Sequence, residues 1–134
     1  MESNDILSYL WTSELQNLQI DLANHRITFE SVRRNDASYS YSVVIEGVMG
    51  FAWLDGYLNN AGHFNTESMN YIDLTSAFTD EDEHQVKVVR GQFFTDYGCT
   101  PNLFFEISNG ASALMVEAKS IRINEHHFVL KSVD

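Results

Sequence analysis

The fold is decided by the stretch LFFEISNGASALMVEAKSIRIN, residues 103–124. Asn109-Gly110 is a strong short-range signal for a β-hairpin, because both residues tolerate left-handed backbone angles. Downstream, Ile121 and Ile123 alternate with polar residues, which is the two-residue period of a half-buried strand. The stretch therefore predicts an antiparallel hairpin. Its two arms are Leu103–Ile107 and Ala113–Asn124.

The first third of the chain shows a similar pattern. Apolar and polar residues alternate in Leu18–Leu22, and the alternation resumes in Arg26–Glu30. The residues between them, Ala23–His25, include an asparagine, which adopts turn conformations readily. A second hairpin is therefore predicted here. Before it, the apolar residues of Asp5–Glu14 are at helical spacing, which predicts a short N-terminal helix.

The centre of the chain also has a strand-like pattern. Tyr39–Trp53 alternates, but Gly47 and Gly50 interrupt it, and glycine inside a strand often marks a bulge or a close backbone approach. Two consecutive strands and one bent strand both fit. Trp53 is predicted to be a core residue. Further strands are predicted at Met69–Leu74, from Val86 onward and at Phe128–Leu130, whereas Thr95–Asn102 is predicted to be a loop.

Short strands thus outnumber the single helix, and turn residues recur at intervals typical of antiparallel sheets rather than of alternating strands and helices. With 134 residues, 44% of them hydrophobic, the chain is long enough to bury a sizeable core. We predict a mainly β fold: a single globular domain over residues 1–134. It is expected to be an antiparallel sandwich or barrel-like sheet with one short N-terminal helix.

The charge of the chain narrows the classes of partner. There are 19 acidic and 8 basic residues, a formal net charge of −11. Between Asn35 and Val86 the chain has nine carboxylates and no Lys or Arg. Such a surface repels nucleic acid and attracts cationic partners. Nucleic acid is therefore not expected as a partner, and a protein with a basic surface is favoured.

Acidic and aromatic residues of this middle region are the predicted partner-binding residues. The run Asp80–Glu83 is expected to form an acidic loop, and Tyr57 lies in a turn-rich segment where its ring could anchor a contact. The run does not fit a calcium loop, because its acids are consecutive and the central glycine is missing. The predicted partner-binding residues are Asp55, Tyr57, Glu67, Asp73, Asp80, Glu81, Asp82 and Glu83.

Motifs for catalysis, metals or cofactors do not occur in the sequence. The glycine patterns of phosphate loops and of nucleophile elbows are missing. Cys99 is the only cysteine, so it has no partner for a structural zinc motif or an intrachain disulfide. His126 and His127 are adjacent and point to opposite faces of a strand, so they are predicted to be surface or edge residues. We expect no enzyme activity, no cofactor and no metal site.

The sequence also bears on location. Met1–Asp5 is acidic and polar, unlike a secretory or transit signal, and no apolar run is long enough to cross a bilayer. A single cysteine suits a reducing compartment. A cytoplasmic protein without membrane contact is expected, and no oligomeric state is predicted.

Two blocks of the sequence are similar to a known family. In the first, Leu7–Phe29, an amphipathic opening leads into the first hairpin; the second, Leu103–Phe128, carries FFEIS and LMVEAKSIRINE. Between them VVIEGV, residues 43–48, and YIDL, residues 71–74, follow in the same order. This layout resembles the YxiG-like family of small, largely uncharacterised bacterial proteins.

The resemblance implies a function but no catalytic residues. Some members of the family lie near polymorphic toxin genes and are suspected immunity proteins. Together with the charge, this leads us to expect a non-enzymatic acidic protein-binding domain, an immunity protein that neutralises a cationic toxin such as a nuclease. An alternative is a small-molecule-binding β domain with an apolar cavity. A hydrolase is a weaker alternative.

Overall fold

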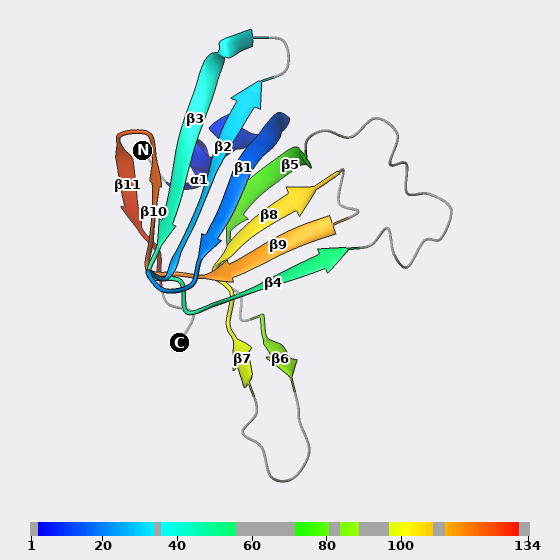
Figure 1. Ribbon diagram of the computed structural model, residues 1–134, viewed down its shortest axis with the longest axis vertical. Coiled ribbons are helices and arrows are strands. Elements are labelled where there is room, and N and C mark those ends of the chain that lie inside the picture. The colour runs from blue at the N-terminus through cyan, green and yellow to red at the C-terminus, as the bar shows by residue number, and fades with distance from the viewer. Residues whose placement is uncertain are drawn as a thin grey trace, which may run out of the picture.

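The computed structural model confirms a mainly β fold (Figure 1). It describes residues 3–33, 36–55, 72–80, 84–88, 97–108 and 112–131. In these ranges nine strands form one antiparallel sheet in the order β11-β10-β3-β2-β1-β5-β8-β9-β4, and β6 and β7 form a separate ladder. The elements are α1 (Ser3–Leu7), the 3₁₀ turn η1 (Ser8–Leu10), β1 (Ser13–Asp21), β2 (Arg26–Arg33), β3 (Asp36–Glu46), β4 (Gly50–Asp55), β5 (Ile72–Thr79), β6 (Val86–Val88), β7 (Tyr97–Cys99), β8 (Leu103–Ile107), β9 (Ser112–Glu117), β10 (Ser120–Ile123) and β11 (His126–Val129).

Both predicted hairpins are confirmed, with changed bounds. β8 pairs with β9 in antiparallel register from Leu103↔Val116 to Ile107↔Ser112. β1 and β2 pair up to a turn between Asp21 and Arg26. The second arm of the 103–124 hairpin is not one strand, however, because it divides into β9 and β10.

The predicted N-terminal helix is shorter than Asp5–Glu14. The helical residues end with η1, and β1 begins only three residues later. The Ser13 hydroxyl donates to the Leu10 carbonyl at 2.7 Å, and the Thr12 N–H donates to the Thr75 carbonyl at 3.3 Å. Pairing with β5 therefore ends the helix before Thr12. The spacing of nearby residues cannot reveal this long-range effect.

The sheet turns a corner where two strands change direction together. β3 runs into β4 through residues 47–49, and β9 runs into β10 through Ala118 and Lys119. Gly47 has a φ of 65°, and a Cβ there would lie 2.8 Å from the Lys119 Cβ. Only glycine fits this position readily, because it lacks a Cβ and accepts a positive φ. The alternative of two consecutive strands is thus the correct one.

The corner folds the sheet into two facing halves, β11-β10-β3-β2-β1 and β5-β8-β9-β4. Phe29 on β2 and Phe105 on β8 pack edge to face, with ring centroids 5.4 Å apart. In a flat sheet these strands would be three spacings apart, about 14 Å. The contact therefore requires the halves to lie face to face, as in a sandwich. Figure 1 shows the halves diverging upward from a shared lower end.

One core fills the space between the halves. A β-bulge at Asn17, with a φ of 55°, shifts the register between Gln16 and Gln19. Leu15, before the bulge, is part of the core, and Leu18, after the bulge, packs against the same core. The bulge thereby keeps the apolar residues of β1 on one face. The largest fully buried side chains include Phe105, Ile6, Leu7, Leu10, Ile27 and Ile45.

Candidate functional site

Exposed apolar side chains are concentrated on β4, which is one edge of the nine-stranded sheet. Met49 precedes β4, and Phe51, Trp53 and Leu54 lie on it; these four side chains are between 36% and 56% exposed. Proteins usually protect an edge strand with charges, proline or a covering segment. β4 reads GFAWLD, with a single charge at its end. This apolar edge is therefore a candidate contact surface.

Two of these residues belong to the core face of the sheet. Phe51 is paired with Val116 and Trp53 with Leu114, and both partners on β9 are buried. Directly opposite residues share a face, so the two aromatic rings extend the core surface onto the edge strand. The prediction that Trp53 is a core residue is wrong, because its side chain is 41% exposed at this rim.

An apolar groove lies between β4 and the end of the β1–β2 hairpin, with a volume of about 220 Å³. Ile20 lies on the opposite wall of the groove and shares the core face of the hairpin with its strand partner, the buried Ile27. Leu22 is 71% exposed at the lip. The apolar lining comes from Ile20, Leu22, Ile27, Val48, Met49 and Phe51.

Asp21 gives this groove a fixed negative charge. The Asn24 side chain donates to one carboxylate oxygen at 2.8 Å and the Asn24 N–H to the other at 3.2 Å. These hydrogen bonds lower the pKa of Asp21, and Arg26 lowers it further. Asp21, His25 and Arg26 also line the groove. An apolar floor with charged residues around it suits an amphipathic segment better than a purely apolar one.

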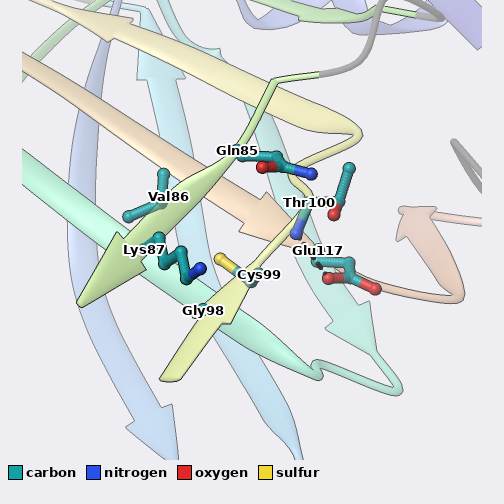
Figure 2. A pocket seen from close by; sticks show the side chains of 7 residues that line it. All are labelled: Gln85, Val86, Lys87, Gly98, Cys99, Thr100 and Glu117. Atoms are coloured by element: carbon teal, nitrogen blue, oxygen red, sulfur yellow. Dashed lines mark hydrogen bonds between the residues drawn. The ribbon is translucent and has the colours of Figure 1, made fainter. Parts of the chain in front are cut away.

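A second pocket, of about 280 Å³, lies around Cys99 (Figure 2). Its lining comes from β6 and the preceding Gln85, from β7 and the following Thr100, and from Glu117 at the end of β9. The Thr100 N–H donates to Glu117 Oε1 at 2.7 Å. Burial, and then the nearby Glu117 charge, raise the pKa of the Cys99 thiol above its ordinary value. A protonated thiol is a weak nucleophile, and none of the seven residues lining this pocket is a histidine.

The sequence did not reveal the Cys99 pocket. Thr95–Asn102 was predicted to be a loop, whereas Tyr97–Cys99 forms strand β7. β7 pairs with β6 through Val86↔Cys99. Short strands of this kind have too few residues to show alternation.

The predicted acidic residues do not form one cluster among the residues described. Asp73 is half-buried at the start of β5, opposite Glu14 on β1. Asp80 follows the other end of β5, about 20 Å away along the strand, and its Oδ2 lies 3.0 Å from His84 Nε2. Asp55 is the last residue of β4. Tyr57, Glu67, Glu81, Asp82 and Glu83 lie outside the described residues.

The histidines at the C-terminal end are surface residues, as predicted. His126 and His127 are both exposed on β11, the edge strand opposite β4 in the sheet order. Within the ranges that the structure describes, no group of three His, Cys, Asp or Glu side chains could hold a metal ion. In the same ranges no helix has both the length and the apolar character needed to span a membrane.

Comparison with protein families agrees with the layout of the sequence. Residues 3–128 match the model described as YxiG-like protein. The chain belongs to the YxiG-like family. The match runs from α1 into β11, so the groove and the Cys99 pocket both lie within the YxiG-like region. No curated protein matches the chain.

Sequence reasoning missed the apolar groove. The alternation of Tyr39–Trp53 predicted that Val43 and Ile45 share one face of a strand, and both side chains are buried. Alternation shows which face of a strand each residue lies on, but it does not show where the strand lies in the sheet. Phe51 and Ile20 are exposed because their strands reach the rim of the sandwich. The one available signal was the lack of charge in GFAWL, residues 50–54.

Proposed function

We propose that this YxiG-like protein is a non-enzymatic protein-binding domain that recognises a cationic partner protein. The observation that carries the proposal is the apolar edge strand β4 on a chain whose net charge is −11. Buried apolar surface stabilises a complex. Opposite charge speeds the encounter and disfavours like-charged partners. The two properties together suit a partner with a basic surface and exposed apolar residues.

The partner class we propose is a cationic toxin, such as a nuclease with a basic nucleic-acid cleft, and the location is the cytoplasm. An inhibitor of such a toxin needs no chemistry, because covering the cleft is sufficient. In this proposal the carboxylates of Asp80–Glu83 steer the toxin toward the protein, and an aromatic side chain anchors the contact. Asp55, Tyr57, Glu67 and Asp73 are the further acidic and aromatic residues assigned to binding.

Co-expression tests the proposed function. The chain is produced together with toxins encoded beside its gene, and host survival and recovery of a complex are scored. We expect survival and a co-purifying complex with one such toxin. An unrelated toxin of similar positive charge is the control for charge alone. A catalytically inactive form of the neighbouring toxin separates binding from survival. Neighbouring toxins that neither bind nor are neutralised would refute the proposal.

A further inference from the structure

The ladder between β2 and β3 stops where the sheet turns its corner. β2 accompanies β3 as far as Arg26↔Glu46, and one more bond follows, from the Val48 N–H to the His25 carbonyl at 2.8 Å. β3 then continues into β4, but β2 does not continue with it. Within the described ranges β4 pairs with β9 alone. The edge of β4 that continues the β2 side of β3 therefore carries no strand there.

The apolar groove lies beside this edge. Val48, Met49 and Phe51 form its β4 side, and the end of the β1–β2 hairpin forms the other. A strand added to β4 would extend the β5-β8-β9-β4 half and place alternate side chains over the groove, because side chains of a strand alternate between two faces. Such an addition would cover Phe51 and Trp53, the core-face residues left open at the rim.

We propose that an extended segment of a cationic partner protein adds a strand to the edge of β4 that none of the described strands pairs with, and places apolar side chains in the groove. This inference rests on the proposed function and names the surface and the binding mode. Main-chain hydrogen bonds would give affinity, and the groove would select alternate apolar residues. β4 spans six residues, so the segment needs about six.

Charge favours this occupant over a second copy of the chain. Two copies would each bring a net charge of −11 to the contact, whereas a basic segment brings the opposite charge. Asp21 lies at the groove with its pKa lowered, so it stays ionised at neutral pH and can meet a Lys or Arg of the segment. The segment is therefore amphipathic, with apolar residues toward the groove and basic residues alternating with them.

A synthetic peptide tests the binding mode without knowledge of the natural partner. The probe is a terminally blocked peptide of alternating valine and lysine, about eight residues long. Amide hydrogen exchange of the free protein should show slow and fast amides alternating along β4. The peptide should slow the fast amides and bind with a Kd below about 1 mM at low salt. No saturable binding, or protection elsewhere only, would overturn the proposal.

Backbone methylation separates strand pairing from charge attraction. Methylating the amide nitrogens of either the valines or the lysines removes the donors of one peptide edge and leaves the charge unchanged. One of these two peptides should bind at least about tenfold more weakly, because it cannot donate to β4. Equal binding of all three peptides would show attraction by charge alone and would overturn strand addition.

Two lysine variants locate the site on the protein. Leu22→Lys, at the groove, should weaken peptide binding about tenfold or more. Val129→Lys is the matched control, because it makes the same charge change on β11 at a residue that is 79% exposed. Both sites are largely exposed, so neither change should unfold the protein. Equal affinities of the two variants would overturn the assignment of the site to β4.

The remaining outcomes identify other occupants. Slow exchange at every β4 amide of a monomer without peptide would show that this chain covers its own edge. A dimer in sedimentation equilibrium with the same protection would assign the edge to a second copy. Either result overturns the inference. If the Leu22→Lys and Val129→Lys variants neutralise a neighbouring toxin equally well, the proposed function stands and only the β4 docking mode is refuted.

Discussion

At the scale of single residues, Asn102 connects three parts of the fold. Its side chain is buried and makes three hydrogen bonds to the backbone: its Nδ2 donates to the carbonyls of Ala118 and Lys131, and its Oδ1 accepts from the Ala118 N–H. Asn102 thus holds the C-terminal segment against the corner between β9 and β10. Asn102→Ala would remove all three hydrogen bonds, and it would leave the buried N–H and carbonyl of Ala118 without the side chain that pairs with them.

We expect Asn102→Ala to lower the free energy of unfolding by about 2–4 kcal/mol, since each unsatisfied buried group costs about 1–3 kcal/mol. Urea unfolding followed by fluorescence measures this change. Asn24→Ala is the control, because Asn24 is exposed and its loss should cost about 0.5 kcal/mol or less. Equal effects of the two substitutions would show that Asn102 is not the anchor described above.

The Cys99 thiol provides a test of electrostatics at the same scale. Only the thiolate is alkylated, so the rate of modification by iodoacetamide follows the ionised fraction. We expect the midpoint of the pH–rate profile to lie above 9.0, the ordinary thiol value, because burial and Glu117 disfavour the thiolate. Glu117→Gln should move the midpoint downward. It removes the charge and keeps an acceptor for the Thr100 N–H. A midpoint that Glu117→Gln leaves unchanged would contradict the charge effect.

At the scale of elements, β8 offers a pair of neighbouring rings on opposite faces. Phe105 is fully buried and touches Phe29 on the facing half, whereas Phe104 is half-buried and stacks on Phe78. Phe105→Ala should cost about 3–5 kcal/mol of unfolding free energy, because it removes a core contact between the two halves and leaves a cavity. Phe104→Ala should cost clearly less. The same urea measurement compares them, and a larger loss for Phe104→Ala would contradict the assignment of faces.

How much of the fold the sequence predicts depends on how local the deciding interactions are. The two hairpins follow from turn residues and alternation within about twenty residues, and both are present. The end of the N-terminal helix does not follow, because the Thr12–Thr75 bond and the pairing of β1 with β5 decide it. The exposure of Trp53 has a similar cause: its face is readable from alternation, but its place on an edge strand is set by the order of the whole sheet.

At the scale of the whole molecule, the sequence predicts that the surface is acidic, but it does not predict where the acidic and apolar patches lie. The excess of acids is fixed by composition. The structure places Asp73 and Asp80 at opposite ends of β5, so closeness in sequence did not make these two acids one patch. The apolar groove is formed by β1 and β4, which are far apart in the sequence and meet only because the sheet turns its corner. No local pattern could have brought these strands together.

Charge reversal tests whether the run Asp80–Glu83 steers the partner. Changing all four residues to lysine should lower the association rate with the neutralised toxin about 10–100-fold at low salt, with a weaker dependence of that rate on salt. The dissociation rate should change little, because steering acts before contact. Stopped-flow mixing at several salt concentrations measures both rates.

The matched control makes the same total charge change at dispersed sites, by placing lysine at Asp5, Glu30, Glu106 and Glu125. It should slow association less than the reversed run does. If the variant with the reversed run associates as fast as the unmodified chain, this run is excluded as the steering element. If the association rate falls equally in both variants, steering is due to net charge alone.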